Sequence, residues 1–332
     1  MNHPKAIFIG SCLLFLFGCT SAPVKEETTS TSEEKLVVAE EAAYPTIEVG
    51  KGPDALFLTP QQDMLYVANV EDTFISVIDT KLDNVVATIS GVRYPWGFTH
   101  LRNSNLVAAS GWDKQIAIID FTTHQVVKEK TFSSNLGGIT SSADGEFIYV
   151  IAATDKKVLK LNRNLDIVAT FDTGNGADGI GISEDNSKVY VTNTKDGSIS
   201  IIHLKDGTAS LIQTGGKPEL VHPSADGKLL YISNFLENKV HVLDTRTDSV
   251  IHEITALDGT EEAIVDRNDQ QLYVVNFNTA KLFVYDIPNY TKLKTEYSTG
   301  NKPIGVIATN DKLYVTNYGD NTVSVIPHKR VK

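Results

Sequence analysis

The chain has 332 residues, 41% of them hydrophobic and 21% charged, which is typical of a globular protein and excludes a disordered chain or a polytopic membrane protein. Its formal net charge of -11 would repel a phosphate backbone, so nucleic acid is not an expected partner. The cysteines, Cys12 and Cys19, both lie near the N-terminus, which excludes a disulfide scaffold, a cysteine-based zinc site, attached c-type haem and a catalytic thiol in the rest of the chain.

The N-terminus is organised like an export signal. Lys5 supplies a positive charge, and residues 6–17 form an apolar stretch too short to span a bilayer stably. The stretch ends in Leu16-Phe17-Gly18-Cys19, which resembles the lipobox of bacterial lipoproteins, although the phenylalanine is bulkier than the residue usual there. The resemblance implies that residues 1–18 are a lipoprotein signal peptide and that Cys19 is lipidated, which would give a stable membrane anchor. The alternative is an ordinary signal peptide with a coincidental cysteine.

A polar segment follows the predicted anchor. Residues 19–43 are rich in Ser, Thr and Glu and show no period that could bury a face, so we expect a disordered acidic linker. A flexible chain of this length spans roughly 25–30 Å, enough to hold a folded body clear of lipid headgroups. Thr20 follows the cysteine, where an Asp in the family retains the lipoprotein in the inner membrane. The resemblance therefore implies the outer membrane, and leaves open whether the body faces the periplasm or the cell exterior.

From residue 44 the chain repeats with a period of 41 or 42 residues. Each copy contains a short anchor strand, an alternating run such as FISVID at 74–79, a third run such as VVATI at 85–89, and a preceding strand of small residues. The anchors are LYVAN at 65–69, LVAAS at 106–110, IYVIA at 148–152, VYVTN at 189–193, LYISN at 230–234, LYVVN at 272–276 and LYVTN at 313–317. Period-two alternation with regularly spaced turn residues predicts four antiparallel strands per repeat.

Seven such units predict an all-β fold, a seven-bladed β-propeller of four-stranded antiparallel blades over residues 44–328. The anchors resemble the YVTN-type propeller repeats of bacterial and archaeal exported proteins, and the resemblance covers about residues 45–327. The seventh copy stops three strands into its blade, whereas residues 44–49 carry an outer-strand pattern. We therefore expect this N-terminal strand to join the last blade and close the ring. Residues 329–332 form a short basic tail.

Residues that recur in most repeats are expected to be structural. We expect the asparagines that end the anchors to bind the following turn, the anchor tyrosines to pack between blades, and the aspartates after the third strand to tie the next hairpin. These residues are Asn69, Asn193, Asn234, Asn276 and Asn317; Tyr66, Tyr149, Tyr190, Tyr231, Tyr273 and Tyr314; and Asp79, Asp120, Asp244 and Asp286.

The position about twelve residues before each anchor tyrosine varies between repeats. It is predicted to start the innermost strand at one mouth of the central channel, and it holds, in blade order, Asp54, Trp96, Gly137, Asp178, Glu219, Glu261 and Ile304. Four carboxylates around one opening should attract a metal or organic cation and raise one another's pKa. The alternative is that they only solvate the rim. We therefore expect no cofactor, and a divalent cation at this mouth is the alternative.

The second repeat is the least regular. It holds Trp96 at the channel mouth, Trp112 in the turn after the anchor, His100 on the inner strand, and Ser110 in place of the corner asparagine. Both tryptophans are expected on the acidic face, and an aromatic pair beside charges is typical of a contact site. Trp112 and His100 are therefore candidate partner contacts. The alternative is that Trp96 plugs the channel and Trp112 covers a blade junction.

Three classes of function remain. The favoured one is an exported, membrane-anchored binding or scaffold module for a protein or saccharide partner, since no catalytic motif occurs. The second is an enzyme, because lactonases, streptogramin lyases and dehydrogenase subunits are built on similar propellers. Its concrete version is a metal held by the four mouth carboxylates, with His222 as base. The third is a cell-surface adhesin.

Overall fold

The computed structural model describes residues 44–328 except 184, 225, 267–269 and 288, and it leaves out the side chains of 294 and 295. The predicted signal peptide, Cys19, the linker and the basic tail lie outside the described residues. In the described part of the chain, no helix is both long and apolar enough to cross a bilayer.

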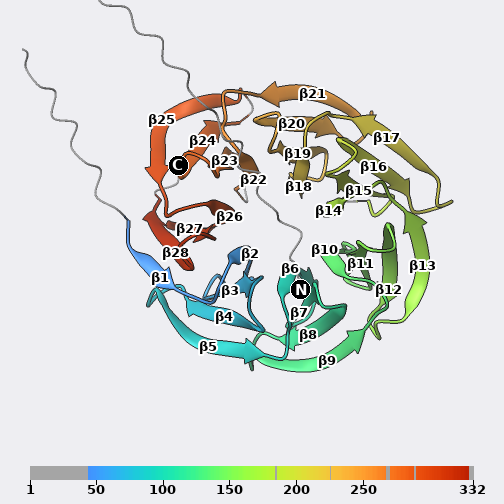
Figure 1. Cartoon of the computed structure of the whole chain (residues 1–332), viewed down its shortest axis with the longest axis horizontal. Coiled ribbons are helices and arrows are strands. Elements are labelled where there is room, and N and C mark those ends of the chain that lie inside the picture. The colour runs from blue at the N-terminus through green and yellow to red at the C-terminus, as the bar shows by residue number, and fades with distance from the viewer. Residues whose placement is uncertain (1–43, 184, 225, 267–269, 288, 329–332) are drawn as a thin grey trace, which may run out of the picture. The chain divides into compact units, whose positions relative to one another are not determined.

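The described strands form seven four-stranded antiparallel sheets arranged in a ring around a channel (Figure 1), which confirms the predicted propeller. Blades one to three consist of β2 (Pro53–Leu58), β3 (Met64–Asn69), β4 (Phe74–Asp79) and β5 (Asn84–Ser90); β6 (Pro95–Leu101), β7 (Leu106–Gly111), β8 (Gln115–Asp120) and β9 (Gln125–Thr131); and β10 (Leu136–Ser141), β11 (Phe147–Ala152), β12 (Lys157–Asn162) and β13 (Ile167–Asp172). Blades four to six consist of β14 (Ala177–Ile182), β15 (Lys188–Asn193), β16 (Ser198–His203) and β17 (Ala209–Gln213); β18 (Pro218–Pro223), β19 (Leu229–Asn234), β20 (Lys239–Asp244) and β21 (Ser249–Ile254); and β22 (Thr260–Val265), β23 (Gln271–Asn276), β24 (Lys281–Asp286) and β25 (Thr291–Ser298). Blade seven consists of β26 (Pro303–Ala308), β27 (Lys312–Asn317), β28 (Thr322–Pro327) and β1 (Thr46–Glu48).

The burial pattern follows from the position of each strand in its blade. The second and third strands, such as β3 and β4, are buried on both faces because neighbouring blades pack against them, and their sequences are almost continuously apolar. The outer strand β5 alternates between exposed and half-buried residues because one of its faces meets solvent. The hydrophobic core is therefore divided among the blade junctions, and each cluster joins two neighbouring blades.

The N-terminal strand closes the ring as predicted. β1 pairs with β28 through Thr46 with Ser324, Ile47 with Val323 and Glu48 with Thr322, and Ile47 is buried. The backbone adds two hydrogen bonds beyond the strand, from Val325 N to Pro45 O and from Val49 N to Asn321 O. The seventh blade is thus built from both ends of the described chain, so β28 is covered and this blade has four strands like the others.

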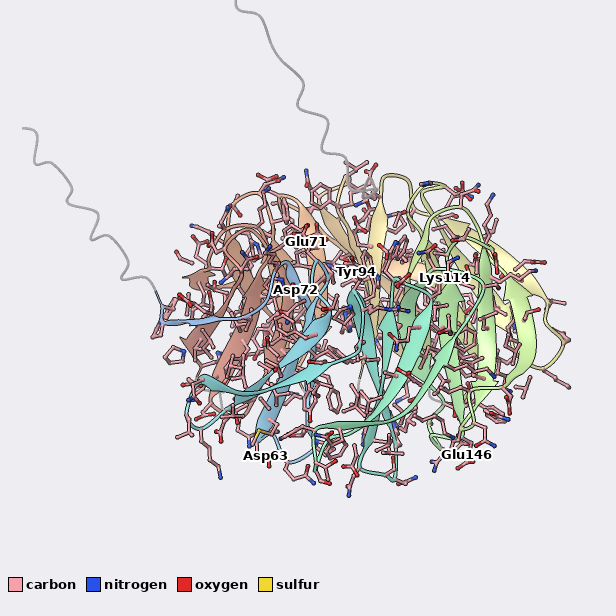
Figure 2. The ribbon with its side chains drawn as sticks, turned by 60° about the horizontal axis from the view of Figure 1, so that its bottom comes forward. Asp63, Glu71, Asp72, Tyr94, Lys114 and Glu146 are labelled. Atoms are coloured by element: carbon pink, nitrogen blue, oxygen red, sulfur yellow. The ribbon has the colours of Figure 1, made fainter. Side chains whose placement is uncertain are left out.

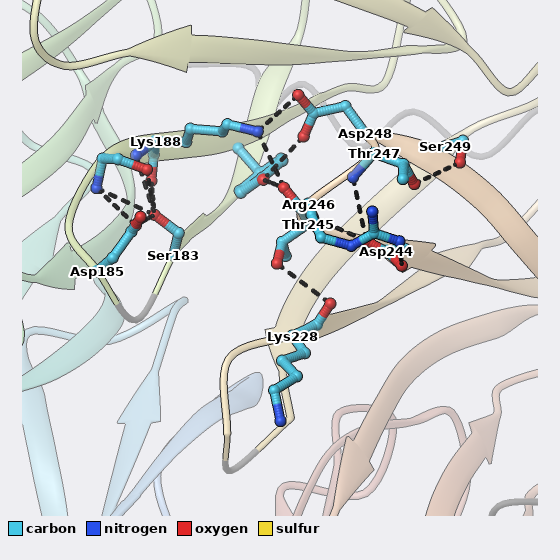
Figure 3. A network of polar contacts seen from close by, with 12 residues as sticks. Ser183, Asp185, Lys188, Lys228, Asp244, Thr245, Arg246, Thr247, Asp248 and Ser249 are labelled. Carbon is cyan, nitrogen blue, oxygen red and sulfur yellow. Dashed lines mark hydrogen bonds and ion pairs between the residues drawn. The ribbon is translucent and has the colours of Figure 1, made fainter.

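Anchor tyrosines join neighbouring blades, as predicted. In blade four the Tyr190 hydroxyl donates to the Asp248 carboxylate of blade five at 3.1 Å, and the Lys188 ammonium pairs with the same carboxylate at 2.7 Å (Figure 3). The same arrangement recurs at the closure, where Lys312 and Tyr314 of blade seven bind Asp83 of blade one. Burial and the adjacent carboxylate raise the pKa of both tyrosines, so their hydroxyls stay protonated and act as donors.

The turn aspartates Asp79, Asp120 and Asp244 have the predicted role, whereas the corner residue Asn193 binds the loop before its inner strand and the third strand instead of the following turn. Asn193 is fully buried, accepts a hydrogen bond from Gly174 N and donates to the Ser198 and Ser200 hydroxyls. Asp79 accepts from the backbone N–H groups of the next turn, as Asp120 and Asp244 do in their own turns.

One expectation for blade two was wrong by a single residue. Leu106 pairs with Asp120 as Met64 pairs with Asp79, and Pro95 pairs with Gly111 as Pro53 pairs with Asn69. The corner position is therefore Gly111, and Ser110 lies one residue before it. The register was not readable from the sequence because this blade has neither the anchor tyrosine nor the corner asparagine that marks it elsewhere.

The propeller has two distinct faces, and every inner strand starts at one and ends at the other. In Figure 2, Glu71, Asp72, Tyr94 and Lys114 lie on what we call the upper face, whereas Asp63 and Glu146 lie on the opposite, lower face. The upper face carries the starts of the inner strands and the turns after the anchors.

Candidate functional site

Seven residues form a ring at the upper mouth of the channel. Each is the second residue of its inner strand, as predicted: Asp54, Trp96, Gly137, Asp178, Glu219, Glu261 and Ile304. The ladder to the second strand shifts register at this point in every blade. Each inner strand therefore has one extra residue relative to the second strand, which is a β-bulge. The bulge changes the direction of the side chain at the mouth.

Hydroxyl groups of the preceding blade hold the backbone of this ring. Thr192 donates to the carbonyl of Glu219 at 2.5 Å, and Ser233 donates to that of Glu261 at 2.6 Å. Thr316 and Ser110 hold the carbonyls of Asp54 and Gly137 in the same way. Ser110 thus has the role of these hydroxyls and not that of a corner asparagine.

Glycine permits the close approach of neighbouring inner strands beneath the ring. A Cβ atom added to Gly179 would lie 2.4 Å from the carbonyl oxygen of Glu219, and one added to Gly305 would lie 2.4 Å from that of Asp54. A larger residue would push the blades apart. The mouth is therefore a rigid frame on which the seven side chains vary.

The acidic residues of blades four to six form one electrostatic unit. Glu219 is only 4% exposed and forms an ion pair with Lys217, which is located two residues earlier on the same rim. Burial, and then the charges of Asp178 and Glu261, raise the pKa of Glu219 to about 8, against the opposing effect of Lys217. Three of the four predicted carboxylates are thus brought together. Asp54 lies on blade one, which is not adjacent to any of these three blades.

These carboxylates do not assemble with His222 into a metal site. Within the described residues, no group of three or more His, Cys, Asp or Glu side chains is placed to hold a metal ion. His222 lies further along β18 and pairs through Nε2 with Glu262 Oε1 at 2.8 Å. The other oxygen of Glu262 accepts the N–H of Val306 from blade seven. The buried Glu262 therefore links three blades, and the pair has a structural role that the sequence pattern did not indicate.

The structure brings the two tryptophans together. The rings of Trp96 and Trp112 lie 5.1 Å apart between centroids at 36°, and both are half-buried. The backbone fixes this contact, because Trp112 N donates to Tyr94 O and the side chain of Asn135 donates to Trp112 O. The pair lies on the upper face, as predicted, across the mouth from the acidic blades four to six. Neither ring is fully covered.

The structure separates His100 from this pair. His100 lies near the lower end of β6, where Nε2 donates to Ser104 O at 2.9 Å and the ring packs against Phe57 and Phe121. The tryptophan pair and His100 thus belong to opposite faces. Trp96 and His100 are close in sequence but far apart in space, because four residues on a strand span about 13 Å.

Further aromatic residues on the upper face were missed. They are Phe235, Phe277 and Tyr318 in blades five, six and seven, and they occupy the position directly after the corner residue, which Trp112 holds in blade two. Their N–H groups all bind the residue just before an inner strand, and Phe235 packs on Phe277 with Lys217 over its ring. An alignment of the repeats that included the residue after each corner position would have shown that this residue is often aromatic.

Comparisons with known proteins support the fold. No protein-family model matches the chain, and no curated protein matches it. Among solved structures it is similar to hydrazine synthase of Kuenenia stuttgartiensis, with a TM-score of 0.74, 16% identity, and coverage of 88% of this chain and 99% of that one. It is also similar to the β-propeller domain of Cps50 (Swd1) from Myceliophteria thermophila, with a TM-score of 0.72, 9% identity, and coverage of 86% and 98%. At such identities the likeness shows the architecture alone: this chain is a seven-bladed β-propeller.

Proposed function

We propose that this chain is an exported, lipid-anchored binding module whose upper face contacts a protein partner. The observation that carries the proposal is the half-buried Trp96–Trp112 pair, held in place by the backbone on the same face as the acidic mouth. Aromatic side chains that are rigid before binding lose little entropy on contact, and they dominate the energetics of many interfaces.

The charge of this face favours a basic segment in the partner. Asp178 and Glu261 place negative charge on one side of the mouth, and the aromatic rings present faces that attract cations. A lysine- or arginine-bearing segment satisfies both features. A saccharide, which would stack on the tryptophans without using the charge, is the alternative that the test must separate.

The test is a pull-down in which the full chain is immobilised and captures partners from solubilised membranes. We compare the wild type with Trp96→Ala/Trp112→Ala and with a control, Ile167→Ala/Leu211→Ala, which removes exposed apolar residues from outer strands. We expect the wild type and the control to retain the same protease-sensitive partner, and the tryptophan variant to lose it. Identical partner sets for all three would contradict the proposal, and retention of protease-resistant glycan would identify a saccharide site.

The anchor is part of the same proposal and rests on the lipobox-like residues 16–19. Replacing Cys19 by Ala should release an intact body into the soluble fraction, because several acyl chains hold a protein far more stably than one. The variant staying with the membranes would show that the lipid anchor is wrong. Density fractionation of the wild type checks the outer membrane, and protease treatment of intact cells distinguishes a periplasmic body from a surface adhesin.

A further inference from the structure

The lower mouth of the channel contains a cavity that the proposed function does not use. Its volume is about 330 Å³, within the range of small-molecule sites. The ends of the inner strands of blades one to five line it, so it is separated from the tryptophan pair by the length of β6.

One side of the cavity is apolar. The rings of Phe57 and Phe98 lie 6.3 Å apart between centroids, and Ile182 and Pro223 continue this surface. Phe57 also packs on His100 and Phe121, so its ring is fixed from behind. A flat or branched apolar group would find a preformed surface here.

The other side carries donors that the protein does not use. Among the described residues, the side chains of Thr99, Thr140 and Arg102 line the cavity without a hydrogen bond or an ion pair. By contrast, the Ser141 hydroxyl donates to His100 O and the Ser183 hydroxyl donates to Asp185. The groups left for a ligand are therefore a guanidinium and two hydroxyls, which match an acceptor with two oxygens.

Aspartates on the nearby turns do not occupy these donors. Asp144 accepts from Ser142 and from Glu146 N, and Asp226 accepts from Ser224 and pairs with Lys228. Each carboxylate is thus satisfied within its own turn. Arg102 remains the charged group that a ligand in the cavity would meet.

We propose that this lower pocket binds a small organic carboxylate with an aromatic or branched apolar body. The carboxylate binds Arg102 and the hydroxyls of Thr99 and Thr140, and the body packs on Phe57 and Phe98. The proposal is independent of the upper face, since a partner could bind there whether or not this pocket is filled.

The experiment measures binding of benzoate and of its uncharged analogue benzamide to the purified full chain by calorimetry. We expect benzoate to bind at least about tenfold more tightly than benzamide, because a hydrogen bond to a charged group contributes more than a neutral one. Arg102→Gln should weaken benzoate about tenfold and leave benzamide within about twofold. Phe98→Ala should weaken both.

Arg246→Gln is the matched control, since it removes an exposed arginine that is paired with Asp244 and lies outside the cavity lining. It should leave both affinities unchanged. Equal binding of benzoate and benzamide, no saturable benzoate binding up to about 10 mM, or equal losses in the Arg102 and Arg246 variants would each overturn the proposal. Thermal melts of the variants verify that they are folded, because Arg102 is exposed and its loss should not affect stability.

Discussion

Two rings of residues lie side by side on the upper face and differ in residue type and in burial. The corner ring, residues 69, 111, 152, 193, 234, 276 and 317, is asparagine in five blades and is buried throughout. The mouth ring, residues 54, 96, 137, 178, 219, 261 and 304, holds five residue types and is mostly half-exposed. In blade one the corner Asn69 pairs with Pro53, next to Asp54.

The difference shows how a repeat protein separates stability from recognition. A position whose side chain satisfies buried polar groups in most blades admits few residues, because an unsatisfied buried polar group costs about 1–3 kcal/mol. A position whose backbone is already held by a neighbouring hydroxyl leaves its side chain free to vary. The varied ring is therefore where binding specificity can be built.

The largest expected effect comes from removing β1, the strand that closes the propeller. Deleting residues 44–49 removes β1 and leaves β28, which binds the corner Asn317 through Ser324, as an open edge. We expect a loss of more than about 4 kcal/mol in the free energy of unfolding, measured by urea denaturation. Deleting residues 30–35 of the predicted linker is the control of equal length and should change nothing. Equal stability of the two deletions would refute the closure.

A single corner residue should matter more than its neighbour in the mouth ring. Asn193→Ala removes two buried hydrogen bonds and one part-buried one, and we expect it to cost about 2–3 kcal/mol of unfolding free energy. Asp178→Asn, on the inner strand of the same blade, should change stability by less than about 0.5 kcal/mol. Similar losses for the two variants, by urea denaturation at pH 7, would mean that the rings do not differ in kind.

Glu219 is the mouth residue that should affect stability, through pH. Its pKa is raised to about 8 in the folded protein, above the usual 4.5, so the folded state holds the proton more tightly than the unfolded state. The contribution is therefore complete below pH 4.5 and is lost as the pH rises towards and through 8. We expect the wild type to lose about 1–3 kcal/mol between pH 6 and 8 relative to Glu219→Gln.

A second variant sharpens this test. Glu261→Gln removes one of the charges that raise the pKa of Glu219, so the pH window should move to lower pH and not disappear. Parallel stability curves for the wild type and Glu219→Gln across pH 5–9 would show that Glu219 titrates normally.

Only a modest effect on stability is expected at the tryptophans. Trp112→Ala removes a half-buried ring and one aromatic contact, which should cost about 1 kcal/mol in thermal or urea unfolding. Retention of the partner should nevertheless fall more than for Asn193→Ala assayed under conditions where both variants are folded. If the tryptophan variant binds the partner normally, the mouth ring and its neighbours are not part of the contact surface.

Much of the architecture was predictable from local patterns. The alternation in FISVID at 74–79 and the repeated anchors predict the strands, and the missing outer strand of the seventh copy predicts the closure by residues 44–49. These features depend on neighbours in sequence or on a repeated period. The register of blade two was not predictable in this way, because Gly111 and Ser110 carry no mark of the repeat.

The sequence by itself therefore determined the number of blades, their strand order, the closing strand, the positions of the mouth ring and those of the corner ring outside blade two. Only the tertiary structure decided that Glu219 is buried beside two other carboxylates, that His222 pairs with Glu262, that Trp96 packs on Trp112, and that His100 lies at the opposite mouth. The physical reason is that strands and turns are encoded within a repeat. Desolvation and contact between side chains of different blades depend on how residues some forty positions apart pack together.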